Sequence, residues 1–559
     1  MHDVVVEGAT VVDGTGRPGF TADVAVAGGL IRAVGRDLGP ARERVAAAGL
    51  VLAPGIVDTH THYDAQVTWD AMLSPSPAMG VTTAIMGNCG FTVAPCRPAD
   101  RDLTMRNLTH VEGMALEALR TGVRWEFESF PEYLDFLEQR GVGINVATFV
   151  GHSSLRTWAL GADAPRRAAT GAEVAEMRRL LLEAMRAGAV GFSTTTSGQH
   201  NGENGIPMPS RLADAAEMEA LTGALSEVGR GVLMMTKDAT ERARQFEGWA
   251  AAAGRPFVIA ALLHSSVTPE AVFEDLAQMA DARARGVTLR GAMSPCPLTM
   301  EFTLHSPYVF EGLRAWRPAM QAADDAAYRS LLASPAFRDG LAEELGRTER
   351  RLFNGQWDRV VVLKVRDPAR AHLEGRTVAE CAAEAGCRPF DWLLDLGLAE
   401  DLETCFIATL LNSDEDAVGR MLRDPDALVS LSDAGAHLEF FCDAGFALHV
   451  LGHWVRERGE LPLEAAVHRM TGEPAALFGL RGRGRIAEGM AADLFLFDPA
   501  TVGRGPARRV HDLPAGASRL VTPAYGVHGV WVNGVRLVDE GGMRAGLPLA
   551  GRVLREFDA

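Results

Sequence analysis

The 559-residue sequence lacks several features that would assign it to a membrane or to a disulfide-stabilised class. Its first residues, Met1-His-Asp-Val-Val-Val-Glu7, contain no basic segment followed by an apolar one, so we expect no secretory signal. No later apolar run is long and uncharged enough to cross a bilayer. Seven cysteines, an odd number scattered along the chain, do not form the pattern of a disulfide framework. We therefore expect a cytoplasmic protein with mostly buried thiols.

Positive charge is in deficit, with 55 Lys and Arg against 72 Asp and Glu and a formal net charge of −17. Nucleic acids and anionic membrane surfaces both require a basic surface, so neither is an expected partner. A small substrate responds to the local field of its pocket and is not excluded, and a homo-oligomer also stays open. With 47% hydrophobic residues, the chain is long enough for a large catalytic domain and a smaller one.

The most informative stretch is Gly49-Leu-Val-Leu-Ala-Pro-Gly-Ile-Val-Asp-Thr-His-Thr-His-Tyr63, an apolar run that ends in Asp58, His60 and His62. Residues two apart in a strand project from the same face, so His60 and His62 can bind one ion. Neutral imidazole suits zinc and other divalent transition metals. Two ordinary histidines at a strand end are the alternative for this motif taken alone.

Both ends of the chain contain short β-type runs separated by Gly and Asp turns. They include residues 4–6, 10–12, 24–27 and 30–34 in the first part, and residues 494–497 and 527–532 in the last part. The second of these last runs is followed by Asn533-Gly534, a strong hairpin signal. Neither part has a large core of its own, so we expect residues 1–54 and 485–559 to pair into one small β-sandwich domain.

Between these parts, in residues 55–484, apolar strand-like runs alternate with helical patterns, which indicates repeated βα units and a parallel sheet. Eight candidate strands end near His62, Cys89, His152, Thr194, Lys237, His264, Ala292 and Asp433. This pattern predicts an α/β fold with a (β/α)8 TIM-like barrel, whose reactive groups lie at the carboxyl ends of its strands.

Residues 171–187 are expected to form a helix that ends at Gly188. The proline-containing segment 295–360 is expected to be an insertion that shapes the pocket.

Two further residues fall at predicted strand ends. Asp433 ends the run 426–433, where a carboxylate can bind a metal and accept a proton from water; an N-cap of the next helix is the alternative. Cys89 lies in Gly87-Asn-Cys-Gly90, where glycines allow the backbone to approach an ion; a buried thiol is the alternative.

The order of these motifs resembles the amidohydrolase superfamily and, within it, the N-acyl-D-amino-acid deacylase group. The resemblance covers nearly the whole chain and rests on residues 4–16, 54–62, 80–90, 151–156, 191–194, 432–437 and 484–498. It implies the same barrel, with a sandwich built from both chain ends. It also implies that Asp433 is the catalytic residue and that Cys89 and His264 are metal ligands. A His at position 264 could instead orient the substrate carbonyl.

The chain departs from that group in two respects. The fifth strand carries Gly231-Val-Leu-Met-Met-Thr-Lys237 where the group has a metal-binding His, so we expect one zinc ion rather than two. Lys237 is a doubtful ligand that would need carbamylation, and an uncharged or salt-bridged lysine is the alternative. The two cations that hold the substrate carboxylate in the group are also missing. Lys237, Arg290 or His437 replaces them, or the substrate is not a free N-acyl amino acid.

Three other positions receive weaker predictions. His152, at the third strand end, lines the pocket or supports neighbouring strands. His200 lies in a Gly-rich loop, read as a lid or a plain surface loop, and Glu112 is read as part of a solvated face.

These observations predict a metal-dependent enzyme that hydrolyses a linear amide, most simply the amide of an N-acyl amino acid such as an N-acyl-D-amino acid or an acylated lysine. Zinc would activate water, and Asp433 would take its proton and return it to the leaving nitrogen. A cyclic-amide hydrolase of the hydantoinase or dihydropyrimidinase type, or a deaminase, is the alternative on the same barrel. A non-enzymatic metal-binding scaffold is the second alternative.

Overall fold

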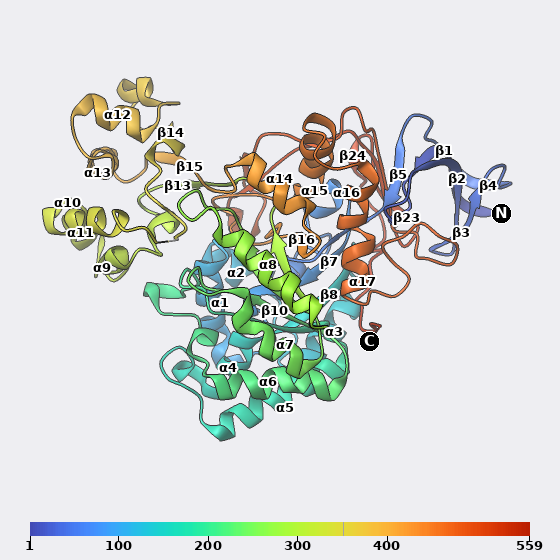
Figure 1. The fold of residues 1–559 in the computed structure, drawn as a ribbon, viewed down its shortest axis with the longest axis horizontal. Coiled ribbons are helices and arrows are strands. Elements are labelled where there is room, and N and C mark those ends of the chain that lie inside the picture. The colour runs from blue at the N-terminus through green and yellow to red at the C-terminus, as the bar shows by residue number, and fades with distance from the viewer. Residues whose placement is uncertain (350, 559) are drawn as a thin grey trace.

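The computed structural model describes residues 1–349 and 351–558, and its centre is an eight-stranded parallel sheet (Figure 1). The strand order is β16-β12-β11-β10-β9-β8-β7-β6. The strands are β6 (Ile56–Asp58), β7 (Val81–Met86), β8 (Asn145–Gly151), β9 (Gly191–Thr195), β10 (Val232–Thr236), β11 (Phe257–Leu262), β12 (Leu289–Met293) and β16 (Ala427–Val429). All eight predicted strands are present, and each ends within a few residues of its predicted position.

The two edge strands of this sheet come together at their carboxyl ends. Thr61, after β6, forms an isolated parallel bridge with Ala434, after β16, and the His62 amide donates to the Ala434 carbonyl oxygen at 2.8 Å. The hydroxyl oxygens of Thr59 and Ser430 are 2.5 Å apart. The sheet is therefore curled like a barrel, and the segments that carry His62 and Asp433 are neighbours although they are far apart in sequence.

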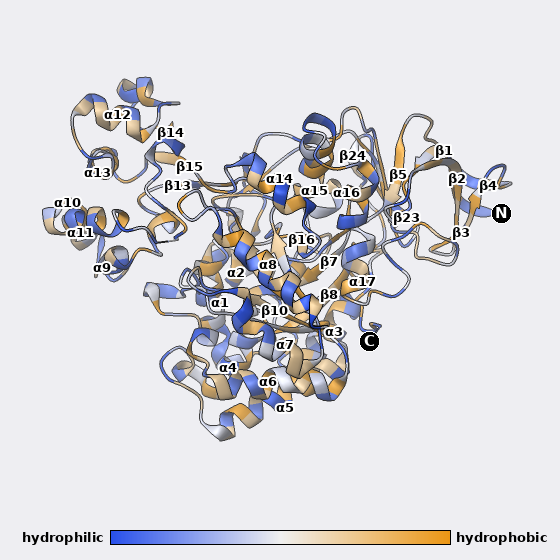
Figure 2. Cartoon of the chain, in the orientation of Figure 1, coloured by the Kyte–Doolittle hydropathy of each residue, from blue (hydrophilic) through white to orange (hydrophobic). Residues whose placement is uncertain are grey.

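Helices cover the outside of the sheet, and strands β7 and β8 are buried at every position. Figure 2 shows hydrophobic (orange) and hydrophilic (blue) stretches alternating along covering helices such as α5 and α8. The helices are α1 (Arg101–Val111), α2 (Leu116–Gly122), α3 (Phe130–Arg140), α4 (His152–Leu160), α5 (Gly171–Ala187), α6 (Ala215–Val228), α7 (Glu247–Ala253), α8 (Ala271–Ala284), α14 (Glu415–Arg423), α15 (Phe446–His449), α16 (Leu463–Met470) and α17 (Gly472–Leu477). The predicted helix 171–187 is confirmed. It starts with a capping box between Thr170 and Glu173 and ends at Gly188.

The insertion between β12 and α14 is longer than predicted. It forms its own antiparallel sheet, β13 (Leu298–Phe302), β15 (Cys405–Leu411) and β14 (Val360–Lys364), in that spatial order. Its helices are α9 (Arg317–Met320), α10 (Asp325–Ala333), α11 (Pro335–Leu345), α12 (Val378–Ala385) and α13 (Pro389–Ala399), which form a separate lobe at the upper left of Figure 1. The segment ends near residue 411 rather than 360, because β15 returns to pair with β13 and local sequence patterns do not reveal such a distant pairing.

Strands from both chain ends join in one nine-stranded sheet, ordered β24-β23-β22-β17-β5-β1-β2-β3, with β4 on β1. These strands are β1 (His2–Val11), β2 (Phe20–Ala27), β3 (Leu30–Gly35), β4 (Ala41–Ala46), β5 (Val51–Pro54), β17 (Leu494–Phe497), β22 (Val527–Val532), β23 (Val535–Asp539) and β24 (Gly542–Met543). Short pairs β18 (Gly503–Arg504) with β21 (Ala524–Tyr525) and β19 (Arg508–Val510) with β20 (Arg519–Val521) lie between them in sequence.

Side chains of this sheet alternate between two cores. Leu494 and Leu496 belong to a small cluster with β1 and β2, whereas Phe495 and Phe497 belong to the main core of the protein. The Asn533-Gly534 hairpin occurs as predicted, and both residues have positive φ, 46° and 83°. The pairing of the chain ends is thus confirmed, and a separate sandwich domain stays a prediction.

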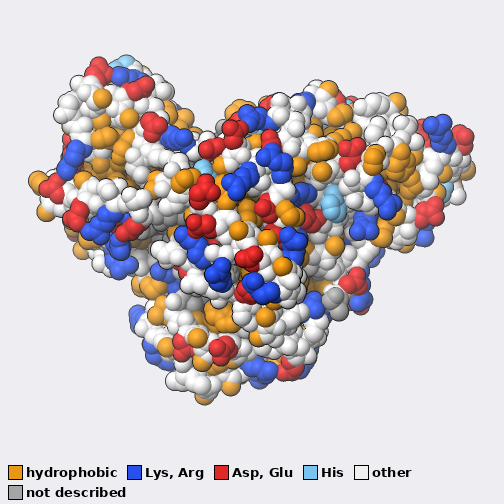
Figure 3. Space-filling model, in the orientation of Figure 1, with side chains coloured by type: hydrophobic (Ala, Val, Ile, Leu, Met, Phe, Trp, Pro, Cys, Tyr) orange, Lys and Arg blue, Asp and Glu red, His pale blue; other side chains and the backbone are white. Residues whose placement is uncertain are grey.

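Acidic and basic side chains are interspersed on the face shown in Figure 3. Among the described residues, no helix combines the length and apolar character needed to cross a bilayer.

Candidate active site and metal centre

His60 and His62 follow β6 directly and are both buried, with 2% and 5% of their surface exposed. The preceding Asp58 carboxylate accepts a hydrogen bond from the Ser432 hydroxyl at 2.6 Å and lies 3.4 Å from the His60 amide nitrogen. Burial raises the pKa of Asp58 to about 7, against the opposing effect of the Ser432 hydrogen bond. Asp58 thus joins the end of β6 to the segment after β16 and holds His60 in place.

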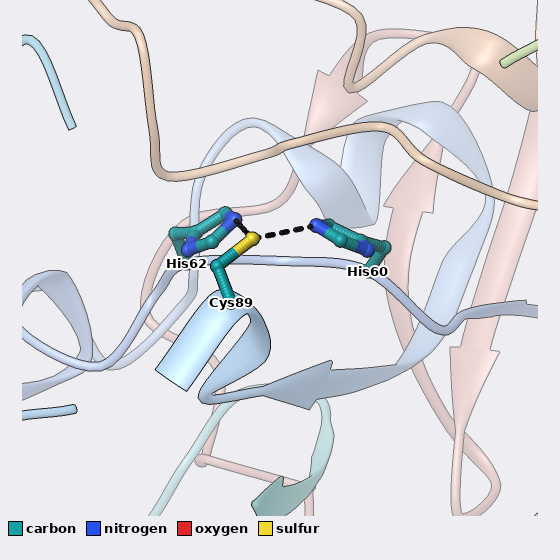
Figure 4. Close-up of side chains that lie close together, drawn as sticks. All are labelled: His60, His62 and Cys89. Carbon is teal, nitrogen blue, oxygen red and sulfur yellow. Dashed lines mark hydrogen bonds between the residues drawn. The ribbon is translucent and has the colours of Figure 1, made fainter. Parts of the chain in front are cut away.

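Cys89 lies in a tight turn directly after β7. Its own φ is 57°, and the neighbouring Gly87 and Gly90 also have positive φ. A side chain at Gly87 would come within 2.8 Å of the Phe149 carbonyl oxygen, so the turn requires glycine there. This turn directs the thiol toward the two imidazoles. Its Sγ lies 3.5 Å from His60 Nε2 and 3.8 Å from His62 Nε2 (Figure 4).

Asp433 approaches the two imidazoles from the segment that follows β16. Its Oδ1 is 3.1 Å from His60 Nε2 and 3.5 Å from His62 Nε2. Its side chain is 19% exposed, whereas those of the two histidines are 3% and 4% exposed. The carboxylate is therefore more exposed than the imidazoles, and it lines both adjoining cavities.

The spacing of these donors fits a metal ion. Nitrogen and sulfur ligands bound to zinc at about 2.0–2.3 Å in a tetrahedron lie roughly 3.3–3.7 Å apart. His60, His62 and Cys89 place one donor each within 4.8 Å of one another, and the separations of 3.1 to 3.8 Å from the imidazole Nε2 atoms to Cys89 Sγ and Asp433 Oδ1 bracket this range. Three protein donors with Asp433 beside a fourth position resemble a catalytic rather than a closed structural site.

The charges of these groups depend on one another. Burial alone would lower the pKa of His60, but Asp433 and Cys89 beside it raise that pKa to about 9. Burial would raise the pKa of Asp433 and of Cys89, yet the neighbouring histidines hold both below their ordinary values. The cluster therefore favours a thiolate and a carboxylate, which are the forms that bind a metal cation.

Glu112, just after α1, is part of this site, and the prediction of a solvated face is wrong. It is 4% exposed, and its Oε1 lies 3.1 Å from His62 Nδ1. A carboxylate beside the second ring nitrogen orients a metal-binding imidazole with Nε2 toward the ion. No sequence motif connects Glu112 to the histidines.

Two adjoining cavities open from the cluster. The inner one, about 90 Å³, is lined by His60, His62, Cys89 and Glu112 among others, and the outer one measures about 170 Å³. Both are lined by His200, Thr236, Ala261, Leu431, Asp433 and His437. The outer cavity also receives residues of the insertion, namely Leu298, Met300, Tyr308, Arg351, Leu352 and Leu411. The expectation that the insertion shapes the pocket is confirmed.

Comparison with known proteins identifies the family. A model described as "Amidohydrolase family" matches residues 43–538, which is most of the chain. The chain belongs to the amidohydrolase family. It is 32% identical to a D-aminoacylase of Alcaligenes xylosoxydans xylosoxydans over 98% of this chain and 97% of that protein. Amidohydrolases of this group act on carbon–nitrogen bonds other than peptide bonds, and this chain is such a hydrolase.

Solved structures agree with this assignment. An N-acyl-D-glutamate deacylase from Bordetella bronchiseptica, in complex with zinc and a phosphonate inhibitor, superposes with a TM-score of 0.66 at 26% identity and covers 99% of this chain and 100% of that chain. A D-hydantoinase also shares the fold, with a TM-score of 0.53 at 15% identity over 99% of both chains. The N-acyl-D-glutamate deacylase neighbour thus binds zinc, and in this chain His60, His62 and Cys89 are placed where they could hold a metal ion.

The fifth and sixth strand ends of this amidohydrolase contribute no imidazole to the cluster. Thr236 ends β10, and its hydroxyl lies 3.1 Å from Cys89 Sγ. Ala261, on β11, lines the same inner cavity. Lys237 does not turn toward the donors, because its Nζ lies 3.1 Å from Asp275 Oδ2 and donates to the Glu241 carbonyl oxygen at 2.9 Å. The salt-bridged alternative for Lys237 is the one that the structure contains.

His264 is not brought to the cluster, contrary to expectation. His264 lies two residues beyond the end of β11 and lines neither cavity, whereas Ala261 and Leu263 do. Its ring lies 6.3 Å from Phe273 of α8, and its amide donates to Asn412 Oδ1 at 2.7 Å. The chain after β11 therefore directs His264 away from the donors.

The substrate-binding prediction for Arg290 is wrong. This residue lies near the start of β12, at the opposite end of the sheet from the donors, and its guanidinium pairs with Glu473.

His152 is fully buried between Thr194 Oγ1 at 2.8 Å and Glu217 Oε1 at 2.7 Å, and is absent from the lining of both cavities. Of its two predicted roles, the supporting one fits the structure. His437, in contrast, lines both cavities next to Asp433.

Proposed function

We propose that this amidohydrolase deacylates N-acyl amino acids with one zinc ion held by His60, His62 and Cys89, and with Asp433 as the general base. The position of Asp433 carries this proposal. Its carboxylate lies 3.1 and 3.5 Å from the two imidazoles and faces the cavities. Support for the amide class comes from the full-length relative named D-aminoacylase.

The residues divide the chemistry among them. A zinc ion at these donors would polarise the scissile carbonyl and make a water molecule more acidic. Asp433, whose neighbouring histidines keep its pKa low against the effect of burial, is ionised and able to accept the proton of the attacking water. The same carboxyl group then delivers that proton to the leaving nitrogen. His437, whose Nδ1 is buried without a hydrogen-bond partner and which lines both cavities with Asp433, is a proposed contact to the substrate.

One metal ion rather than two is supported by the composition of the cavity wall. A second ion would need further donors, and the ends of β10 and β11 supply only Thr236 and Ala261 beside Cys89. The imidazoles of His200 and His437 also line the inner cavity, and this proposal assigns them to the substrate. Neither a methyl group nor a neutral hydroxyl is a strong zinc ligand. The amine of Lys237 is held by Asp275, so carbamylation would first have to break a buried ion pair.

Arg351 is the proposed partner of the substrate carboxylate. In the described part of the chain, Lys237 and Arg351 are the Lys and Arg side chains that line the outer cavity. Lys237 is neutralised by buried Asp275 at 3.1 Å, whereas Arg351 pairs at 3.1 Å with Glu349, whose side chain is 46% exposed, and lies 3.9 Å from buried Glu344. Water screens Glu349 and the contact with Glu344 is long, so the guanidinium keeps more of its attraction for a further carboxylate.

A substrate panel combined with metal analysis tests the proposal. The purified protein would be assayed on N-acyl-D- and N-acyl-L-amino acids, acylated lysine, hydantoin and dihydropyrimidine, and its zinc content would be measured. We expect turnover of N-acyl amino acids and one zinc per chain. Turnover of the cyclic amides alone, or full activity in chelator without bound metal, would contradict the proposal.

The carboxylate anchor has a more specific test. Arg351→Gln should raise KM for an N-acyl amino acid about 10- to 100-fold, the range expected for loss of a charge-assisted hydrogen bond. The matched substrate is the same compound with a terminal carboxamide, for which the variant should differ little from wild type. An equal change in KM for both compounds would assign the carboxylate to another partner.

A further inference from the structure

His200 is a buried residue of the site to which neither its sequence motif nor the proposed reaction gives a chemical role. It lies in the loop after β9, is 9% exposed, and lines both cavities beside Asp433 and His437. Its carbonyl oxygen accepts from the Met208 amide and from Arg211 Nη1, each at 3.1 Å. The loop is therefore anchored at this residue, and His200 itself is buried in the site, although its loop was expected to be a lid or a plain surface loop.

Hydrogen bonding determines which ring nitrogen of His200 carries the proton. Nδ1 lies 2.7 Å from the Thr195 hydroxyl oxygen. That hydroxyl donates its single proton to the Thr236 carbonyl oxygen at 3.0 Å and accepts from the Ser197 amide at 3.1 Å. Thr195 therefore accepts from His200, so Nδ1 carries hydrogen and Nε2 carries a lone pair.

The ring is also neutral. Burial, with a smaller contribution from the nearby His437, lowers the pKa of His200 to about 3. Phe91 contacts the ring at a centroid distance of 4.9 Å and restricts its orientation. Since Nδ1 is bonded to Thr195, Nε2 is the nitrogen left for the cavity, and it can only accept a hydrogen bond.

We propose that His200 Nε2 accepts a hydrogen bond from the N–H of the scissile amide and thereby selects secondary amides. This inference rests on the proposed deacylase function. Of the two polar groups of the reacting amide, the carbonyl oxygen is an acceptor and only the N–H is a donor. An acceptor-only nitrogen beside Asp433 can therefore recognise the nitrogen side, which is the side where Asp433 must deliver a proton. Thr195 is the corresponding positioning residue, because it sets the tautomer.

A pair of substrates that differ only at this group tests the inference. The N-acyl amino acid carries N–H, and the matched O-acyl hydroxy acid carries an ester oxygen in its place. In His200→Ala we expect kcat/KM to fall about 10- to 100-fold for the amide and less than about threefold for the ester. Zinc content should equal that of wild type. Equal losses on both substrates, or a loss of zinc, would overturn the inference, the second outcome making His200 a metal ligand.

Three further variants distinguish the proposed contact from a folding defect and from a merely structural role. His200→Gln keeps a similar volume and an amide oxygen as acceptor, so it should retain part of the preference for the amide. Thr195→Val should reduce the same preference without changing zinc content, and Thr195→Ser should restore it. A Thr195→Val enzyme that loses amide and ester turnover equally would contradict the positioning role.

Binding measurements keep the result independent of turnover. In an Asp433→Asn background, calorimetry would give dissociation constants for the amide and the ester with and without His200→Ala. A loss of affinity confined to the amide supports the contact, and equal losses refute it. Failure of the wild-type enzyme to hydrolyse any N-acyl amino acid would instead refute the proposed function, so the two failures are distinguishable.

Discussion

Two groups of strand ends face the same cavities, but only one of them carries metal donors. The ends of β6, β7 and β16 present His60, His62, Cys89 and Asp433, whereas the ends of β10 and β11 present Thr236 and Ala261. The first group is held by buried polar contacts, such as Ser432 to Asp58 at 2.6 Å. The second group lines both the inner and the outer cavity but supplies no strong metal ligand.

The difference indicates that the two sides of the site perform different tasks. Donors on one side fix the ion and the base, and the other side, together with the insertion and His200, surrounds the substrate. A barrel permits this division because each strand end is supported separately and can exchange its side chain without altering the sheet. The predictions below challenge this division, starting with the largest effect.

Substitutions in the group formed by His60, His62, Cys89 and Asp433 should impair catalysis in two distinguishable ways. Asp433→Asn should retain most of the zinc but lower kcat about 10²- to 10⁴-fold, because an amide cannot accept the proton from water. His60→Ala should lose both zinc and turnover. Metal analysis of each variant beside its kcat separates the two outcomes. Asp433→Asn protein without zinc that recovers its rate when zinc is supplied would show that Asp433 is only a ligand.

A smaller effect is expected from the residue behind the donors. Glu112→Ala should weaken zinc binding about 10- to 100-fold, because His62 loses the carboxylate that orients it. Glu112→Gln is the matched control, since it keeps an oxygen at this position and should lose less. Competition with a chromogenic chelator measures both affinities. Unchanged zinc affinity in Glu112→Ala would remove Glu112 from the site.

The donor group itself could be predicted from sequence because two simple regularities operate there. Apolar runs that end in a polar residue mark the ends of buried strands, and the carboxyl ends of parallel strands meet at one edge. His60, His62, Cys89 and Asp433 therefore had to converge if the strands were assigned correctly. The distances of 3.1 to 3.8 Å from the imidazole Nε2 atoms to Cys89 Sγ and Asp433 Oδ1 follow from the turn at Cys89 and the contact between the edge strands.

The residues that sequence analysis misplaced depend on contacts between distant segments. Asn412, beyond the insertion, binds the His264 backbone, and His264 lies beyond the end of β11 and lines neither cavity. Glu112 lies after a helix rather than a strand, and His200 lies in a loop that Arg211 anchors. Periodicity within one element contains no information about such contacts, so only the three-dimensional arrangement reveals them.

If the comparison is correct, metal ligands introduced at the ends of β10 and β11 should create a second metal site. In the double variant Thr236→His with Ala261→His, two imidazoles would face Cys89 from the side that now lacks ligands. We expect a second equivalent of zinc, bound more weakly than the first. The single variant Thr236→His is the control and should remain near one equivalent. A double variant that folds and binds only one ion would show that something other than missing donors excludes the second metal.

Lys237 provides the smallest expected effect on the metal. Its amine lies 3.1 Å from Asp275 Oδ2, and both side chains are at most 2% exposed. Lys237→Met should therefore leave zinc content unchanged but destabilise the fold by about 3–5 kcal/mol, because it leaves a buried carboxylate without its partner. Lys237→Met with Asp275→Asn should recover much of this loss, since the second change removes the buried charge while keeping an oxygen for the Ala243 amide. Denaturant unfolding and metal analysis of the same samples measure both quantities. If Lys237→Met loses zinc while keeping its stability, the lysine is a ligand after all, and the wall formed by β10 and β11 is not free of metal donors.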